Sequence, residues 1–321
     1  MNEKRLWNGR RYYSLDAYFK QTFGEKLYKL SLDSGMGCPN RDGTISYGGC
    51  IFCSEGGSGD FAVPRMKRMD EQIEYAKTLV SRKYTGSRYI AYFQSYTNTY
   101  ADVDELRKLF FPVIQREDIA GLSIATRPDC LQEDKMALIA ELASVKPVWV
   151  ELGLQTIHQK TAELINRGYQ LDVYDNAVFR LKQAGADVIT HMIVGLPGET
   201  KEEMLATTAY IGQSGSDGIK IQLLHVLKNT KLYEMYELGE FKTLEEDEYV
   251  SLVADIIAIL PPHIVIHRLT GDGDKSILVS PKWSGDKRRV LNKINHELKC
   301  RQLYQGCCAL VKKISENSCL H

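Results

Sequence analysis

The chain has 321 residues, of which 44% are hydrophobic and 26% charged, an ordinary balance for one large α/β domain or two smaller ones. Its 41 basic and 41 acidic residues cancel, so the overall charge gives no sign of nucleic-acid binding, although a local basic face stays compatible with it. No apolar run approaches the roughly 18 residues of a membrane-spanning helix, and the first residues show no secretion signal. Eight cysteines, three of them in one short loop, fit a reducing compartment better than a disulfide framework, so we expect a cytoplasmic protein without membrane contact.

Residues 1–27 are rich in tyrosine and basic side chains, among them Arg10, Arg11, Tyr12 and Tyr13. Two interpretations are open for this N-terminal extension. Either it packs on the core of the protein, or it forms a lid that faces the substrate and contacts RNA through its arginine and tyrosine side chains.

From residue 28 onward, short apolar runs typical of strands alternate with patterns typical of helices. The strand-like runs are 28–33, 89–94, 120–125, 147–152, 187–194 and 218–223, and the helical patterns include 70–82, 102–116, 132–143, 172–184 and 200–213. The alternation predicts parallel βαβ units, and six of them predict a partial (β/α)6 barrel over residues 28–240, followed by a C-terminal α/β extension over 241–321. Asp102 and Thr200 stand where two helices begin, each with a glutamate three residues later, which predicts two capping boxes.

The loop after the first strand contains Cys38, Cys50 and Cys53, separated by eleven and two residues and surrounded by glycines. Three thiolates in so short a loop indicate a metal centre. Structural zinc and iron–sulfur clusters normally take four ligands, so the loop needs either a distant fourth ligand for zinc or a cluster with one open iron. Three unrelated thiols are a third interpretation, which a glycine-rich loop favours less. The loop lies at the carboxyl end of its strand, where parallel barrels gather their functional residues.

A [4Fe–4S] cluster with one open iron can bind S-adenosylmethionine through the amino and carboxylate groups of that molecule. An electron from the cluster then releases a 5′-deoxyadenosyl radical, and the protein supplies positioning and shielding. The three-cysteine loop resembles that of the radical SAM superfamily, in a longer-spaced variant of its motif. We therefore expect Cys38, Cys50 and Cys53 to bind such a cluster.

Polar residues also lie at the other strand ends. Glu151 is inside an apolar strand, where a carboxylate costs free energy unless it is paired. Its partner is either the ammonium group of S-adenosylmethionine, which we favour, or Arg127. Arg127 in turn either binds a carboxylate in bidentate fashion or forms a salt bridge with Asp129 or Glu151. His191 is either a histidine of the barrel interior whose ring nitrogens are hydrogen-bonded within the protein, or a contact to the substrate.

Together the strand-end motifs resemble radical SAM enzymes of the Elongator-catalytic-subunit type and, among them, the smaller YhcC/YtqA-like bacterial family. The resemblance covers roughly residues 8–310 and rests on the cysteine loop and on segments 126–129, 150–156, 194–199, 218–221, 223–230 and 265–272. It implies a [4Fe–4S] cluster and S-adenosylmethionine as cofactors. Gln94 and His191, both at strand ends, are the candidate catalytic residues. The cofactor-binding residues that the resemblance implies are Gln94, Asn98, Arg127, Glu151, Gln155, Val194, Gly195 and Leu224. Of these, Val194, Gly195 and Leu224 are expected beside the adenine, and Gln155 is assigned to the cofactor without a specific part of it.

The same resemblance implies chemistry on the wobble uridine of tRNA, namely conversion of the 5-carboxymethylaminomethyl(-2-thio) form to the 5-aminomethyl form, with flavodoxin or ferredoxin as the electron donor. Elongator-type enzymes carry an acetyltransferase domain after the barrel, and this chain leaves no room for one, so acetyl transfer is not implied. Two other functions stay open. One is a radical SAM enzyme acting on a small molecule, and the other is a zinc-stabilised binding protein without catalysis.

The C-terminal extension contains a basic stretch between Lys275 and Arg301, with Trp283 inside it. Such a stretch either holds an RNA backbone and stacks a base, or forms the solvated face of an amphipathic helix at 286–301. The remaining cysteines of this region leave a second metal site as a weaker alternative, because the spacing of Cys300, Cys307, Cys308 and Cys319 matches no common pattern.

Overall fold

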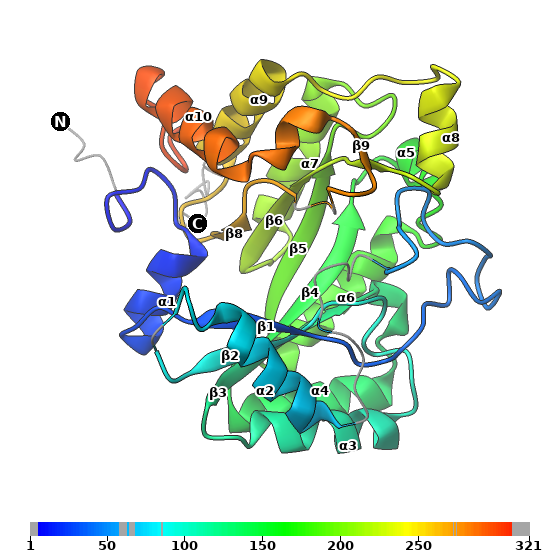
Figure 1. Ribbon diagram of the computed structural model, residues 1–321, viewed down its shortest axis with the longest axis vertical. Helices are drawn as coiled ribbons and strands as arrows, with labels where there is room; N and C mark the ends of the chain where they lie inside the picture. Colours follow the sequence, from blue (N-terminus) through cyan, green and yellow to red (C-terminus); the bar gives the residue numbers. More distant parts are fainter. Residues whose placement is uncertain are drawn as a thin grey trace, which may run out of the picture.

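The computed structural model describes residues 6–57, 63, 68–84, 86–271, 273 and 275–309. Its main sheet has seven parallel strands that curl into a partial barrel, in the order β1-β2-β3-β4-β5-β6-β8 (Figure 1). The strands are β1 (Tyr28–Leu32), β2 (Tyr89–Phe93), β3 (Ile119–Thr126), β4 (Val148–Gln155), β5 (Asp187–Val194), β6 (Gly218–Leu223) and β8 (Val265–Arg268). The predicted partial barrel is thus confirmed, and it gains a seventh strand from the region assigned to the C-terminal extension.

Helices cover the outer face of this sheet (Figure 1). They are α2 (Met69–Val80), α3 (Val103–Ile114), α4 (Glu133–Val145), α5 (Gln159–Leu164), α6 (Leu171–Gln183) and α7 (Lys201–Gln213), with the one-turn η1 (Pro128–Cys130) after β3. Side chains alternate between the two faces of each strand. In β4, Val150 and Leu152 belong to the outer core beneath the helices, whereas Glu151 and Gln155 face the interior of the barrel. This alternation decides which residues reach the site.

The amino-terminal end of the barrel is closed by an aromatic cluster. Helix α1 (Leu15–Phe23) packs Phe19 and Phe23 against Trp149 of β4, with ring centroids 6.0 and 6.2 Å apart. The segment before α1 joins the edge of the sheet, where the backbone nitrogen of Ile266 donates to the carbonyl oxygen of Tyr13 at 2.8 Å. The described part of the N-terminal extension is therefore packed on the barrel, and the interior opens at the carboxyl ends of the strands.

The C-terminal region adds a small two-stranded sheet, and it adds helices of which one packs beside α7 of the barrel (Figure 1). It contains β7 (Val226–Leu227), α8 (Lys231–Glu237), α9 (Glu246–Ile259), β9 (Leu278–Ser280), η2 (Lys282–Gly285) and α10 (Lys287–Cys300). Helix α10 is amphipathic and packs on α9, with Val290, Ile294 and Leu298 buried.

The predicted basic stretch is partly neutralised by acidic residues of α9. Lys293 pairs with Glu246 at 3.0 Å and with Asp247 at 2.7 Å. Trp283 is packed rather than presented to a ligand, because its indole nitrogen donates to the carbonyl oxygen of Leu244 at 3.1 Å and its ring lies 5.5 Å from that of Tyr249. The prediction that Trp283 stacks a base is therefore not supported by its position.

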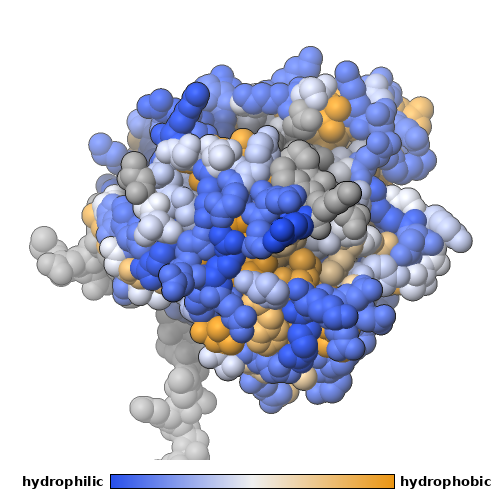
Figure 2. Space-filling model, turned by 60° about the horizontal axis from the view of Figure 1, so that its bottom comes forward, coloured by the Kyte–Doolittle hydropathy of each residue, from blue (hydrophilic) through white to orange (hydrophobic). Residues whose placement is uncertain are grey.

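The surface shown in Figure 2 is mostly hydrophilic, and apolar residues gather on it in only a few places. In the described part of the chain, no helix is both long enough and apolar enough to span a bilayer.

The two predicted capping boxes differ in the structure. At α7, the hydroxyl of Thr200 accepts from the backbone nitrogen of Glu203 at 3.2 Å, and the carboxylate of Glu203 accepts from that of Thr200 at 2.7 Å. At α3, Asp102 occupies the N-cap position, but its side chain makes no capping hydrogen bond.

We expect Thr200→Ala to lower the free energy of unfolding by about 1 kcal/mol, because an orphan amide of α7 loses its acceptor. Asp102→Ala, the matched substitution, should cost clearly less. Urea unfolding of the two variants checks this, and equal losses would show that the box at α7 adds nothing.

Candidate active site

The cysteine loop is fixed by a network of hydrogen bonds around Asn40, a fully buried residue. The side-chain nitrogen of Asn40 donates to the carbonyl oxygen of Asn166 at 2.6 Å and lies 3.6 Å from the sulfur of Cys50. Asn166, between α5 and α6, donates back to the carbonyl oxygen of Gly49 at 2.8 Å. Gly49 has φ +83°, a conformation that L side chains rarely adopt, so glycine is required at this turn. The loop is thereby held against the opposite side of the barrel mouth.

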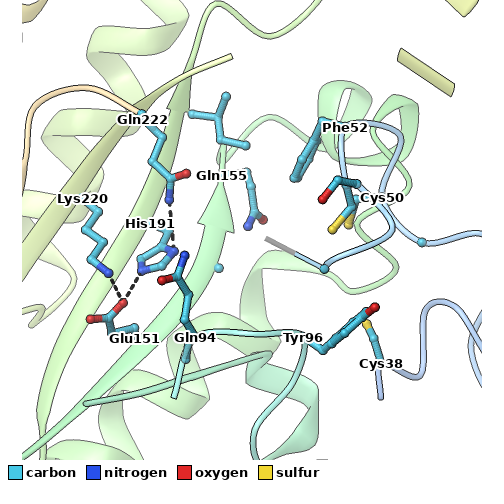
Figure 3. A pocket seen from close by; sticks show the side chains of 18 of the residues that line it. Cys38, Cys50, Phe52, Gln94, Tyr96, Glu151, Gln155, His191, Lys220 and Gln222 are labelled. Atoms are coloured by element: carbon cyan, nitrogen blue, oxygen red, sulfur yellow. Dashed lines mark hydrogen bonds and ion pairs between the residues drawn. The ribbon is translucent and has the colours of Figure 1, made fainter. Parts of the chain in front are cut away.

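Cys38, Cys50 and Cys53 all line one pocket at the carboxyl ends of the strands. Figure 3 shows Cys38 and Cys50 at this pocket. Burial, with Cys53 and Cys38 nearby, raises the pKa of Cys50 to about 12, so a metal centre that binds this sulfur displaces its proton. Among the described residues, no three His, Cys, Asp or Glu side chains converge tightly enough for a single metal ion. Three thiolates facing one cavity fit a four-iron cluster, because they leave one iron for another ligand. Of the C-terminal cysteines, Cys319 lies outside the described residues.

The pocket brings together most of the residues that the sequence predicts for the site. Those that line it are Cys38, Cys50, Cys53, Gln94, Arg127, Glu151, Gln155, His191 and Leu224. Gln94 lies between the cysteines and the Glu151–His191 pair in Figure 3. Three predicted residues, Asn98, Val194 and Gly195, are not in the lining.

The three exceptions have local reasons. Val194 points into the outer core with the helices, and Ile193, one residue earlier, faces the pocket instead. Because strand side chains alternate, an error of one residue exchanges the two faces. Asn98 is fully buried, and its side-chain nitrogen donates to the carbonyl oxygens of Phe93 and Ala125 at 3.1 and 2.7 Å. These hydrogen bonds join two strands. The backbone nitrogen of Gly195 donates to the sulfur of Met204 at 3.2 Å, so it faces helix α7 instead of the pocket.

Glu151 is the centre of a buried polar cluster at the side of the pocket away from the cysteines (Figure 3). It is 1% exposed, and its partners are Lys29 at 2.7 Å, Lys220, His191 at 2.8 Å and the hydroxyl of Ser123 at 2.7 Å. Burial raises the pKa of Glu151, but Lys220, Lys29 and His191 outweigh it and hold the pKa well below its usual value. The carboxylate is therefore ionised and already has two cationic partners.

These partners replace those that the sequence suggests for Glu151. Neither Arg127 nor a cofactor ammonium is needed to neutralise the carboxylate, because Lys29 of β1 and Lys220 of β6 do so. Each lysine is a single charged residue between apolar or aromatic neighbours in a strand. The same pattern, one charged residue inside an apolar strand, is what marked Glu151 in the sequence. The same reasoning about buried charge, applied to lysine, would have found them.

His191 is neutral and fixed at both ring nitrogens. The side-chain nitrogen of Gln222 lies 3.2 Å from Nδ1, so Nδ1 accepts and Nε2 carries the proton that it donates to Glu151. Burial and the neighbouring Lys220 lower the pKa of His191 to about 4, in spite of Glu151. This histidine therefore presents an oriented, uncharged ring to the pocket.

The lowered pKa predicts that acid destabilises the protein through His191. Between pH 6.5 and about 4 the unfolded chain takes up a proton that the folded chain does not, so the free energy of unfolding falls as the pH falls through this window. We expect His191 to account for a loss of about 2 kcal/mol between pH 7.5 and 5. His191→Gln should flatten the curve over this range, while replacement of the exposed His263 should not. A curve unchanged in His191→Gln would contradict the assignment.

Two arginines border the cysteine side of the pocket. Arg127 forms a two-point salt bridge with Asp129, at 2.9 and 2.7 Å, which is one of the two alternatives that the sequence leaves open. Arg167 is 1% exposed and donates to the carbonyl oxygens of Leu154 and Thr156 at 3.0 and 2.7 Å. It thereby holds the end of β4, where Gln155 adopts φ +63°.

Comparison with known proteins gives the family. The family model of the radical SAM superfamily matches residues 34–211, and that of the Radical_SAM C-terminal domain matches residues 216–300. The chain belongs to the radical SAM superfamily. It is 44% identical over 311 residues to the protein YtqA of Bacillus subtilis, a match that covers 97% of this chain and 96% of YtqA. The predicted resemblance to the YhcC/YtqA-like family is thus confirmed.

More distant relatives share the barrel. The tRNA uridine(34) acetyltransferase of Methanocaldococcus jannaschii is 28% identical over 186 residues, which covers 56% of this chain and 34% of that enzyme. The structure of Elp3 from Methanocaldococcus infernus superposes with a TM-score of 0.66 at 17% identity, over 87% of this chain and 64% of that one. This likeness shows a common fold.

Membership of the superfamily fixes the cofactors and the class of the protein. Radical SAM enzymes use a [4Fe–4S] cluster and S-adenosylmethionine, so the protein is an enzyme with these cofactors. The alternative of a zinc-stabilised binding protein without catalysis is therefore wrong.

Proposed function

We propose that this radical SAM enzyme modifies the wobble uridine of tRNA and converts a 5-carboxymethylaminomethyl(-2-thio)uridine to the 5-aminomethyl form. The observation that carries the tRNA assignment is the relationship of the barrel to a tRNA uridine(34) acetyltransferase. That relationship covers 34% of the relative, so acetyl transfer is not part of the proposal.

In this proposal Cys38, Cys50 and Cys53 hold the cluster, and the pocket between them and Glu151 receives S-adenosylmethionine and the uridine side chain. When bound, these cofactors supply a 5′-deoxyadenosyl radical that abstracts a hydrogen atom, with flavodoxin or ferredoxin as the source of the electron. The methylene between the nitrogen and the carboxylate of the substrate is a suitable position, because both neighbours stabilise a carbon radical. Loss of one electron from this radical to a one-electron acceptor such as an oxidised iron–sulfur cluster would give an iminium. Addition of water would then break the bond between the nitrogen and the methylene carbon, release glyoxylate and leave the aminomethyl group.

The residues of the chain bind and orient the reactants. Gln94 lies between the two sides of the pocket, within reach of whatever occupies its centre (Figure 3). His191 is held neutral and oriented by Glu151 and Gln222, so it offers a fixed polar edge rather than a charge. The hydrogen bonds of the buried Asn40 and the packed end of β4 keep the cysteine side rigid.

The test is an incubation of reconstituted enzyme with tRNA that carries the 5-carboxymethylaminomethyl group, followed by digestion and mass spectrometry of the nucleosides. The proposal predicts loss of that nucleoside and gain of the aminomethyl form, in step with 5′-deoxyadenosine. Formation of 5′-deoxyadenosine with the nucleoside unchanged would contradict it and favour a small-molecule substrate.

A further inference from the structure

A group of buried apolar side chains, separate from the main core of the barrel, forms a wall at the cysteine side of the pocket. The members of this apolar wall are Ile51, Ile165, Ile193, Leu196, Leu224, Val226 and Leu232. They come from the cysteine loop, the turn after α5, the ends of β5 and β6, β7 and α8. Phe52 packs against the wall and lines the pocket, and Figure 3 shows its ring beside Cys50. The thiols therefore lie next to an apolar surface to which α8 contributes.

The residue that follows Cys50 is held by backbone hydrogen bonds from two directions. The nitrogen of Ile51 donates to the carbonyl oxygen of Ile165, after α5, at 3.2 Å. The nitrogen of Leu232, in α8, donates to the carbonyl oxygen of Ile51 at 2.9 Å. The side chains of Ile165 and Leu232 are fully buried in the apolar wall. Helix α8 is thus fastened directly to the cysteine loop, one residue away from a thiol.

Helix α8 has little else to hold it in place. Of its seven residues, all of which the structure describes, only Leu232 is buried. A helix of this length is unstable by itself, so its position depends on packing and on its cap. The cap is Thr230, whose hydroxyl accepts from the nitrogen of Tyr233 at 3.1 Å and donates to the carbonyl oxygen of Leu227 at 2.7 Å. At the other end, Leu238 is 75% exposed. The attachment of α8 therefore depends mainly on Leu232 and Thr230.

We propose that α8 is a clamp that holds the cysteine loop closed and shields the [4Fe–4S] cluster from solvent, with Leu232 as its positioning residue. The apolar shell around a metal site controls the access of solvent to it. A segment with few buried contacts opens at a lower free energy than the whole molecule, so α8 can open while the barrel stays folded. Loss of the Leu232 side chain favours the open clamp, in which water and chelators reach the [4Fe–4S] cluster. The clamp acts whichever substrate the enzyme uses.

The experiment measures the loss of iron from the reconstituted enzyme to EDTA under anaerobic conditions, followed through the visible absorbance of the [4Fe–4S] cluster. We expect Leu232→Ala to lose iron about 10-fold faster than the wild type, because truncation of a buried leucine strongly favours the open state. Leu298→Ala is the matched control, since Leu298 is also fully buried but lies in α10, which packs on α9. This variant should lower the free energy of unfolding of the cluster-free protein to a similar extent, yet lose iron within about 2-fold of the wild-type rate.

A milder pair of variants gives a result even if Leu232→Ala does not fold. Thr230→Ala removes the hydroxyl that caps α8, and Thr200→Ala removes the corresponding hydroxyl at α7. Thr230→Ala should lose iron about 3-fold faster than the wild type, whereas Thr200→Ala should lose it at the wild-type rate. An unchanged rate in either α8 variant would overturn the proposal. Equal acceleration by Leu298→Ala or Thr200→Ala would overturn it as well, because iron would then leave through general unfolding.

Discussion

Cys50→Ala is expected to abolish formation of 5′-deoxyadenosine and to reduce bound iron and sulfide to the background. Cys50 is the central thiol of the loop, half-buried and in contact with Asn40, and the described residues contain no group of three His, Cys, Asp or Glu side chains set to hold a metal ion without the cluster. A cluster with two remaining cysteines loses both its stability and the geometry that leaves one iron open. Iron and sulfide analysis of the anaerobically reconstituted protein, together with the nucleoside assay, measures both effects.

The matched control is Cys300→Ala, which removes an exposed thiol at the end of α10. This variant should bind iron and form 5′-deoxyadenosine like the wild type. Full cluster content in Cys50→Ala would show that the loop is not the cluster site. Loss of the cluster in Cys300→Ala would show that a C-terminal thiol takes part.

Glu151→Gln is expected to destabilise the cluster-free protein by about 3–5 kcal/mol, the cost of removing one partner from a buried ion pair. The substitution keeps the size of the side chain, but it leaves Lys29 and Lys220 in the barrel without their carboxylate. Urea unfolding at neutral pH measures the loss. Adding Lys220→Gln to this variant should restore part of the stability, because one of the two unpaired cations is then removed.

An exposed ion pair provides the comparison. Lys231 and Glu234 lie 2.9 Å apart on α8 with side chains 66% and 61% exposed, so Glu234→Gln should produce no measurable change. If Glu151→Gln left the free energy of unfolding as unchanged as Glu234→Gln does, the buried polar side chains around Glu151 would not be an ionised network. If the double variant lost the sum of the two single losses, Glu151 and Lys220 would not be coupled.

The sequence predicts the barrel well because its strands are buried on both faces and are therefore continuous apolar runs. Five of the six predicted strands begin and end within one residue of their observed bounds, and the fourth, predicted over 147–152, continues three residues further to Gln155. The seventh strand, β8, is not among the predicted strands, because its sequence lies in the region assigned to the C-terminal extension. Its place beside β6 follows from long-range pairing, as in the register between Gly218 and Val265.

The candidate site residues that stand out in the sequence are those whose chemistry marks them singly, whereas residues that depend on pairing between distant strands do not stand out. Cysteines in a glycine-rich loop and a carboxylate in an apolar strand are visible without a structure. The partners of Glu151 are not, because Lys29 lies 122 positions away along the chain. Whether Ile193 or Val194 faces the pocket depends on which face of β5 each side chain occupies. A strand that is apolar on both faces does not reveal this in its sequence.

The most direct test of the account measures 5′-deoxyadenosine formed by the anaerobically reconstituted enzyme with dithionite and S-adenosylmethionine, in the presence and absence of bulk bacterial tRNA. The account predicts release that rises when tRNA is added and disappears in Cys50→Ala. Release that is indifferent to tRNA would contradict the proposed substrate. A colourless protein that releases no 5′-deoxyadenosine would contradict the assignment of the cysteine loop itself.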